Sequence, residues 1–297
     1  MTLTVAPDWV AIVNPRSGGR AMPNPLERRL DRIVGRVLVS ERAGHVDALV
    51  RSCPDAAGIV VVGGDGTLFE VLQACNRSCQ KIALIPAGRG NSLAKDLEIA
   101  NMDDGVDCLT HGIDRAIDVL DVTLRHEDGG VWRGVSASNL AIGYPAEVAR
   151  VAGRWRRLGA ASYAVAALAV TPAMLHPRVQ SDDERQTSAS MTGLVISNSR
   201  YVGPFLGFPS SSLFDGVSHT IEMRAGRIRQ TLHNLSSLTG LGFYEPGVRK
   251  DVRSISIELD VPALLKIDGE VRTGVREIHV RLERAAVTFR VPPPRHG

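Results

Sequence analysis

The chain has 297 residues, of which 44% are hydrophobic and 23% are charged, and this composition excludes wholesale disorder. Its 35 basic and 32 acidic residues give a net charge of +3, which is too balanced for a general nucleic-acid-binding protein. The length predicts about two domains. Glycine is frequent, with 29 residues, and the positions of the glycines indicate where the backbone turns sharply or approaches a ligand.

The first seven residues contain neither a basic segment nor an apolar run, so we expect no signal peptide and a cytoplasmic protein. The chain contains four cysteines: Cys53, Cys75, Cys79 and Cys108. Their spacing is not that of a metal site, and with Cys75 and Cys79 on one helical face we expect buried free thiols. The uncharged stretch 158–175 has the length of a membrane span, but it is rich in alanine and contains Pro172. We expect a helix buried within the protein or lining an apolar cavity.

Strand-like apolar runs alternate with helical patterns over residues 1–118. The predicted strands are 9–13, 36–39, 58–62 and 82–85. The run 58–62 is uninterrupted and β-branched, which suits a strand covered on both faces. Alternation of this kind predicts a parallel sheet with helices on both faces. We therefore predict a doubly wound α/β nucleotide-binding domain over residues 1–118.

Strands predominate in the rest of the chain. The predicted strands are 119–125, 132–142, 191–197, 217–223, 252–260, 277–282 and 286–291. Many of them alternate apolar with polar residues, as antiparallel strands with one buried face do. Helical patterns at about 147–175 and 230–240 interrupt them. We predict a β-rich, β-sandwich-like domain over residues 119–297, whose last residues can pack back on the first domain, and an active site in the cleft between the two domains.

Glycine-rich loops follow three of the predicted parallel strands. They are 14–19 (Asn-Pro-Arg-Ser-Gly-Gly), 63–67 (Gly-Gly-Asp-Gly-Thr) and 88–92 (Gly-Arg-Gly-Asn-Ser). Because the carboxyl ends of parallel strands meet at one edge of a sheet, we expect the three loops to face one crevice. Their N–H groups can converge on an anion at a helix N-terminus. Alternatively, Thr67 caps the helix after a tight turn, and Asn91 or Ser92 caps the next helix.

Asp65 lies inside the loop 63–67, where a carboxylate repels a phosphate unless a cation lies between them. The loop therefore predicts the binding of a magnesium-nucleotide complex. No Gly-Lys-Ser/Thr follows, as it would in a P-loop. In the loop 88–92 the position of the third glycine of a dinucleotide fingerprint falls on Leu93, which disfavours a dehydrogenase.

Motifs along the whole chain resemble those of the diacylglycerol kinase catalytic family, which includes bacterial soluble lipid kinases, sphingosine kinases and ceramide kinase. In the first domain they are Asn14-Pro15-x-Ser17-Gly18, Gly63-Gly64-Asp65-Gly66-Thr67 with Glu70, and Pro86-x-Gly88-x-x-Asn91 with Ala94. At the end of the first domain the motif is Ile117-Asp118, and in the second domain they are Asn139-x-x-Ile142-Gly143-Tyr144, Arg157-Leu158-Gly159, Tyr163, 198–201, Asp215-Gly216 and Asp268-Gly269-Glu270.

The resemblance implies magnesium-dependent transfer of the γ-phosphoryl group of ATP to a lipid hydroxyl. It implies that Glu270 accepts the hydroxyl proton, that Asp118 is a supporting acid, and that Asp65 holds the nucleotide's magnesium. The residues implied to contact the nucleotide are Asn14, Ser17, Gly18, Ser40, Gly63, Gly64, Asp65, Gly66, Thr67, Leu68, Phe69, Glu70, Gly88, Arg89 and Asn91. A structural metal is implied at Asp215 with Ser212 and Val217, although a hairpin turn is an equal alternative at Asp215.

The lipid class stays open. The third motif is more like that of sphingosine kinases, but Ala149 stands where those kinases have the aspartate that binds the long-chain amine. A cluster of charged and aromatic residues, Arg154, Trp155, Arg156 and Arg157, is either a solvated helix face or a peripheral contact with anionic headgroups at the inner membrane face.

The alternative functions are an NAD kinase-like phosphotransferase, which shares the Gly-Gly-Asp-Gly loop, and a non-catalytic lipid- or nucleotide-binding protein. A homodimer is left open.

Overall fold

The computed structural model describes residues 6–19, 24–88, 90–158, 161–182, 184–188, 190–202, 206–207, 211–223 and 248–294. The chain folds as two compact units. The first comprises Met1–Val119 and Arg284–Gly297, and the second comprises Leu120–Glu283. Two long strands, β5 (Ile113–His126) and β16 (Glu270–Val291), contribute residues to both units.

The first unit contains a parallel sheet, which confirms the fold predicted for this part of the chain. Its strands are β1 (Ala6–Val13), β2 (Val34–Val39), β3 (Gly58–Gly63), β4 (Lys81–Pro86) and the end of β16. Their order is β2-β1-β3-β4-β16, and every pairing is parallel. All six residues of β3 are buried, as expected for a central strand covered on both faces. Phe289 of β16 lies opposite Ile82 of β4, so the end of the chain completes this sheet.

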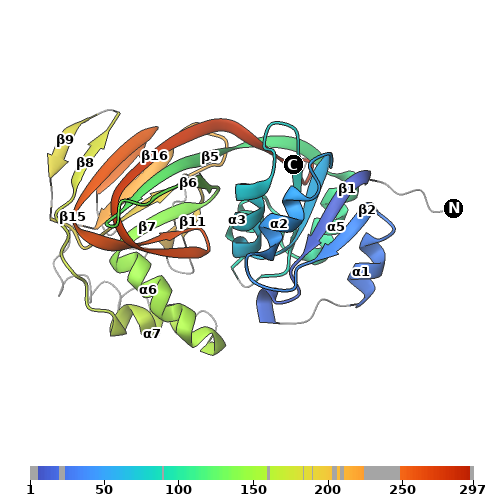
Figure 1. Ribbon diagram of the computed structural model, residues 1–297, viewed down its shortest axis with the longest axis horizontal. Coiled ribbons are helices and arrows are strands. Elements are labelled where there is room, and N and C mark those ends of the chain that lie inside the picture. The colour runs from blue at the N-terminus through green and yellow to red at the C-terminus, as the bar shows by residue number, and fades with distance from the viewer. Residues whose placement is uncertain are drawn as a thin grey trace. The chain divides into compact units, whose positions relative to one another are not determined.

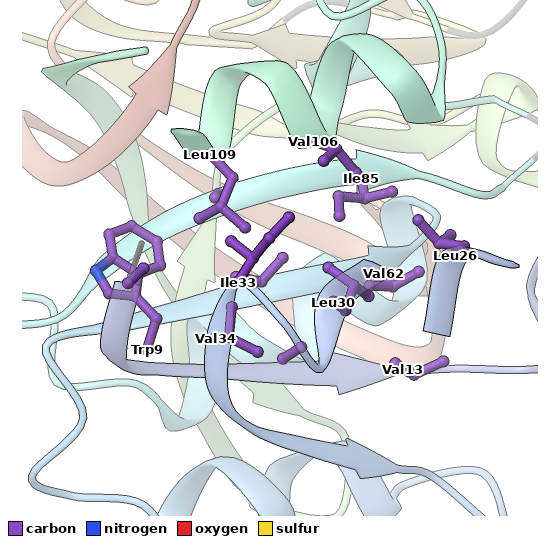
Figure 2. Close-up of a cluster of buried hydrophobic side chains, with 14 residues drawn as sticks. Trp9, Val13, Leu26, Leu30, Ile33, Val34, Val62, Ile85, Val106 and Leu109 are labelled. Atoms are coloured by element: carbon purple, nitrogen blue, oxygen red, sulfur yellow. The ribbon is translucent and has the colours of Figure 1, made fainter. Parts of the chain in front are cut away.

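Helices cover the two faces of this sheet (Figure 1). On one face, α1 (Asn24–Leu30) and α5 (Met102–His111) pack on the strands, and Figure 2 shows Leu30 and Leu109 within this core. On the other, α2 (His45–Arg51) and α3 (Asp65–Ala74) pack against each other and against β1 and β3. Two short helices, η1 (Ser17–Gly19) and α4 (Ser92–Asp96), lie in the loops that follow β1 and β4.

The second unit is built on antiparallel strands, which confirms the pattern predicted there. The strands are β6 (Val131–Ser136), β7 (Asn139–Gly143), β8 (Arg178–Ser181), β9 (Glu184–Ser188), β10 (Gly193–Ser197), β13 (Ser218–Met223), β14 (Val248–Val252) and β15 (Ser254–Ile267), with β5 and β16. The main order is β14-β13-β10-β7-β15-β16, with β6 on β5 and β9 on β8. A separate pair joins β11 (Tyr201–Val202) to β12 (Leu206–Gly207).

Helices α6 (Tyr144–Ala152), η2 (Gly153–Leu158) and α7 (Ala161–Ala169) pack together in the second unit, with α6 against β7 and β15 (Figure 1). In the described part of the uncharged stretch 158–175, Leu158 ends η2 and the α-helix α7 has nine residues. Ala166 is fully buried in this helix, whereas Val165 and Leu168 are exposed, so the expected buried helix is buried on one side only. Within the described residues, no helix is long and apolar enough to cross a membrane.

Two strand predictions were wrong, and each error has a physical cause in the structure. The single strand predicted over 132–142 is divided into β6 and β7, because the backbone amides of 137–139 turn towards the Asp268 carboxylate. The break predicted between 282 and 286 is absent, since β16 continues through Ala285 in the left-handed conformation (φ 48°). The segment predicted as helical at 230–240 lies outside the described residues.

The cysteines differ in exposure. Cys53 and Cys108 are buried, Cys75 is partly buried and Cys79 is exposed, so the prediction of buried thiols is wrong for Cys79. Because α3 ends at Ala74, Cys75 and Cys79 do not share a helical face. Burial raises the pKa of the Cys75 and Cys108 thiols to about 11, which keeps both protonated at neutral pH.

Candidate active site

The glycine-rich loops after β1 and β3 are joined by hydrogen bonds. The Gly64 amide donates to Ser17 Oγ at 2.9 Å, and Asn14 Nδ2 donates to Thr67 Oγ1, also at 2.9 Å. Asn14 is further fixed by its own amide, which donates to the Val62 carbonyl at 3.0 Å. The polar side chains of the first loop therefore hold the second loop in place, as expected for loops at one edge of a parallel sheet.

The loops after β3 and β4 touch through their backbones. A Cβ atom on Gly64 would lie 2.9 Å from Gly88 Cα, and a Cβ atom on Gly88 would overlap Gly64 Cα. In the first loop, Gly18 has φ 69°, and a Cβ atom there would overlap the Ala87 carbonyl oxygen. All three loops thus meet at distances that only glycine permits. Gly18, Gly64 and Gly88 are therefore required for the close contact between the loops.

Asp65, the first residue of α3, links the second loop to the third. Its Oδ1 accepts the Ser92 amide at 2.8 Å, at the first residue of α4. A Cβ atom on Gly90 would lie 2.7 Å from Asp65 Oδ2, so the carboxylate also lies close against this loop. The start of α4 is therefore capped by a side chain 27 residues away in the sequence.

The two helix caps predicted from the sequence are not formed. Asn91 is in the left-handed conformation, and its side chain closes the loop on Gly88, accepting from the amide at 3.0 Å and donating to the carbonyl at 2.9 Å. Thr67 lies within α3, where its hydroxyl accepts a hydrogen bond from the side-chain Nδ2 of Asn14 instead of capping the helix. The Asn91 side chain is bonded to Gly88 within its own loop, and the Ser92 amide at the start of α4 donates to Asp65 instead.

The start of α3 is suited to bind an anion together with a cation. The first amides of a helix have no intrahelical acceptor, and the N-cap residue Gly64 makes no side-chain cap. The side chains of Thr67, Leu68 and Phe69 are buried, so this loop presents mainly backbone and the Asp65 carboxylate. Magnesium typically takes one or two carboxylates together with substrate phosphates. The donor set at Asp65 fits that pattern, and in the described residues no group of three potential ligands forms a complete metal cage.

Two further predicted residues lie in the first unit. Ser40 directly follows β2, and its amide donates to the Val13 carbonyl at 2.8 Å, so it lies at the same strand ends as the loops. Asp118 is buried, and its Oδ1 accepts the amide of Ala285 at 2.8 Å. This bond fixes the left-handed residue of β16. Arg89 lies outside the described residues.

Glu270 is exposed at the start of β16, in register with Ile267 across the turn from β15. Two residues further on, the Arg272 guanidinium lies 4.2 Å from the centroid of the Trp132 ring in β6. Burial lowers the pKa of Arg272, and the nearby Glu270 charge acts in the opposite direction. The sequence motif includes Asp268, but it did not predict that this side chain is buried and hydrogen-bonded to residues 136–139. An Asp-Gly turn gives no signal of such burial.

At Asp215 the side chain binds backbone amides. Asp215 Oδ2 accepts the Ser212 amide at 3.0 Å, and Oδ1 accepts the Val217 amide at 3.1 Å. His219 lies between two carboxylates, 3.4 Å from Asp215 and 2.6 Å from Asp251. This is the geometry of a hydrogen-bonded turn, because amide groups, and not carbonyl oxygens, face the carboxylate. The structural metal stays a prediction.

Of the basic cluster, the side chains of Arg154 and Trp155 are exposed, and those of Arg156 and Arg157 lie outside the described residues. In α6, Arg150 forms an ion pair with Glu147 at 2.6 Å.

Replacing Gly88 by alanine should destabilise the first unit, because the new Cβ atom would overlap the Gly64 backbone and one of the two loops would have to shift. We expect a loss on the order of 1–3 kcal/mol, measured by thermal or urea unfolding. The matched control is Gly153→Ala, since nothing lies within 4 Å of a Cβ atom there and its φ is −58°. Equal stability of the Gly88 and Gly153 variants would contradict the close contact.

Comparison with known proteins supports one family. Residues 8–122 match the sequence model described as the diacylglycerol kinase catalytic domain. A segment of 106 residues is 39% identical to sphingoid long-chain bases kinase 1 of Arabidopsis thaliana, covering 30% of this chain and only 14% of that longer protein.

Solved structures show the same fold. The crystal structure of a diacylglycerol kinase from Bacillus anthracis superposes with a TM-score of 0.74 at 17% identity, covering 96% of this chain and 97% of that one. Yeast NADH kinase is more distant, with a TM-score of 0.54 at 10% identity, over 97% of this chain and 84% of that one. These comparisons confirm the motif resemblance for residues 8–122, which match the diacylglycerol kinase catalytic domain.

Proposed function

We propose that the protein transfers the γ-phosphoryl group of ATP to a hydroxyl group of a lipid. The observation that carries this proposal is the junction of three loops, in which Asp65 is fixed at the start of α3 by its bond to the Ser92 amide. Phosphoryl transfer depends mainly on positioning and on neutralising charge, and a rigid set of backbone donors supplies both.

In this proposal the nucleotide phosphates bind at the loops 14–19, 63–67 and 88–92 and at the start of α3. The loops are already held together by the Ser17–Gly64 and Asn14–Thr67 hydrogen bonds, so little further ordering is needed on binding. Asp65 would hold magnesium, which when bound neutralises phosphate charge. Ser40 and Glu70 complete the nucleotide-contacting set by resemblance to the family.

Glu270 is proposed as the acceptor of the hydroxyl proton. Its carboxylate is exposed at the edge of the second unit, and a carboxylate that takes the proton as the new bond to phosphorus forms contributes roughly 10²–10⁴-fold to the rate. Asp118 plays a different part, because its buried carboxylate is bonded to the Ala285 amide. We propose that Asp118 supports the site by fixing the backbone.

The magnesium role of Asp65 can be tested by Asp65→Asn. The asparagine oxygen can still accept the Ser92 amide, so the loops should stay joined while the negative charge is lost. We expect affinity for magnesium with a non-hydrolysable ATP analogue, measured by calorimetry, to fall at least about tenfold, whereas metal-free binding of the analogue changes little. Asp104→Asn is the control, since Asp104 also accepts a backbone amide in the same unit, that of Ala100. Unchanged magnesium dependence in Asp65→Asn would remove this role.

The reaction itself is tested with labelled ATP against diacylglycerol, a sphingoid base, ceramide, phosphatidylglycerol and NAD. We expect a phosphorylated lipid, and turnover by Glu270→Gln lower by about 10²–10⁴-fold with ATP binding retained. Glu277→Gln is the control, because Glu277 is an exposed carboxylate of the same strand, paired with Arg125. Phosphorylation of NAD alone would favour the NAD kinase-like alternative, and no product from any acceptor would favour a non-catalytic binding protein.

We also propose that one face of the second unit makes a transient contact with anionic membranes. Arg154 and Trp155 of η2 are exposed, and Val165 and Leu168 of α7 are 42% and 45% exposed. The helices η2 and α7 contact each other, and exposed aromatic, apolar and positively charged side chains on such helices are typical of peripheral membrane binding.

Trp155→Ala should therefore reduce co-sedimentation with phosphatidylglycerol-containing vesicles several-fold, because the indole ring no longer inserts among the headgroups. Neutral phosphatidylcholine vesicles should bind both proteins weakly. Val261→Ala removes an equally exposed apolar side chain elsewhere in the unit and serves as the control. If the two variants bind vesicles equally well, this face is an ordinary solvated surface.

A further inference from the structure

Asp268 occupies the turn between β15 and β16, two residues before Glu270. The turn has two residues, Asp268 and Gly269, and Ile267 pairs with Glu270 across it. Asp268 is in the left-handed region with φ 45°, which an aspartate tolerates better than most residues, yet only 8% of it is exposed. A buried carboxylate at a hairpin tip is unusual, because such tips normally lie in solvent.

The Asp268 carboxylate accepts four hydrogen bonds from one short segment. Oδ1 accepts the Ser136 hydroxyl at 2.7 Å and the amides of Ser138 and Asn139 at 3.0 Å each, and Oδ2 accepts the Ala137 amide at 3.1 Å. In the opposite direction, the Asp268 amide donates to the Asn139 carbonyl at 2.9 Å. The segment 136–139 is the bend between β6 and β7, so these bonds fasten the turn to that bend.

A second contact with β6 lies on the other side of Glu270. The Arg272 guanidinium stacks on the ring of Trp132, 4.2 Å from its centroid. Asp268 and Arg272 are four residues apart, and so are their partners Ser136 and Trp132 in β6. The start of β16 is thus attached to β6 at two points, and Glu270 lies between them.

A hairpin does not need this arrangement. Between β5 and β6 the same Asp-Gly pair forms a turn at Asp128, whose exposed carboxylate accepts only the nearby Gly130 amide at 2.9 Å among the hydrogen bonds described. Burying a carboxylate costs free energy unless donors surround it. Burial raises the pKa of the Asp268 carboxyl, while the bonds from Ser136 and the amides act against this shift. The Ser136 hydroxyl and the three backbone amides are therefore needed to keep the Asp268 carboxylate in its buried position.

We propose that Asp268 is a positioning residue for Glu270, holding the β15–β16 turn on the bend 136–139 so that the Glu270 carboxylate points in one fixed direction. The proposal rests on the function proposed for Glu270. Proton transfer requires the acceptor within hydrogen-bonding distance of the hydroxyl group, so a loosened turn lowers turnover even though Glu270 itself is unchanged.

The test begins with Asp268→Asn. An amide nitrogen replaces one acceptor oxygen and then faces donors, so at least one of the four bonds is lost. We expect kcat to fall at least about tenfold and the acid limb of its pH profile to move, while affinity for ATP is unchanged, since the nucleotide loops belong to the first unit. Ser136→Ala removes one donor only and should give a smaller decrease. Asp128→Asn, the matched Asp-Gly turn, should leave kcat as in the wild type.

A double-mutant cycle separates positioning from a general structural role. In the Glu270→Gln background, Asp268→Asn should cause no further loss of kcat, because the residue acts through Glu270. Losses that multiply would overturn the proposal. Hydrogen exchange gives a readout independent of activity: the amides of 137–139 should exchange faster in Asp268→Asn and not in Asp128→Asn. Protection equal to that of the wild type would also overturn it.

The possible failures can be told apart. Full turnover by Glu270→Gln rejects the proposed role of Glu270 and this inference with it. An inactive Glu270→Gln beside a fully active Asp268→Asn rejects only the inference. If Asp268→Asn does not fold, the same cycle and exchange measurement with Ser136→Ala decide the question.

Discussion

The contact between the backbones of Gly64 and Gly88 is the constraint on which the candidate site of the first unit depends. The two loops approach until a Cβ atom on Gly64 would lie 2.9 Å from Gly88 Cα. At that separation the Asp65 carboxylate can reach the Ser92 amide and cap a helix that belongs to the next loop. A longer separation would leave α4 uncapped and Asp65 without this anchor. The two glycines thus set the distance between the loops, and that distance determines where the Asp65 carboxylate is held.

The strand–helix alternation predicted the parallel sheet because each buried strand reads as a continuous apolar run, such as 58–62 in β3. The meeting of three loops followed from the same topology. The break between β6 and β7 could not be predicted, since it is imposed by Asp268, about 130 residues away in the sequence. The unbroken β16 depends in the same way on Asp118, whose carboxylate binds the Ala285 amide. Local patterns indicate elements, whereas the ends of elements were decided here by distant side chains.

Carboxylates that bind distant backbone amides recur in both units. Asp65, Asp118 and Asp268 accept amides from residues 27, 167 and 129–131 positions away, respectively. A sequence motif cannot separate such fastening acids from reacting ones, because Asp65, Asp268 and Glu270 all lie within one or two residues of a glycine. Exposure does separate them, since Asp118 and Asp268 are buried while Glu270 is exposed. This difference in exposure agrees with the roles that the resemblance implies, in which Glu270 accepts the proton and Asp118 is a supporting acid.

The substrate whose hydroxyl group accepts the phosphoryl group has to be identified from residues outside the matched range 8–122. Residues 8–122 match a diacylglycerol kinase model, and the whole fold is also similar to an NADH kinase. A shared fold therefore says little about which hydroxyl is phosphorylated. In the second unit, Glu147 is already paired with Arg150 at 2.6 Å, so a cationic headgroup would have to compete with an arginine there. By the resemblance to sphingosine kinases, the position of their amine-binding aspartate falls on Ala149, two residues after Glu147, and alanine carries no charge.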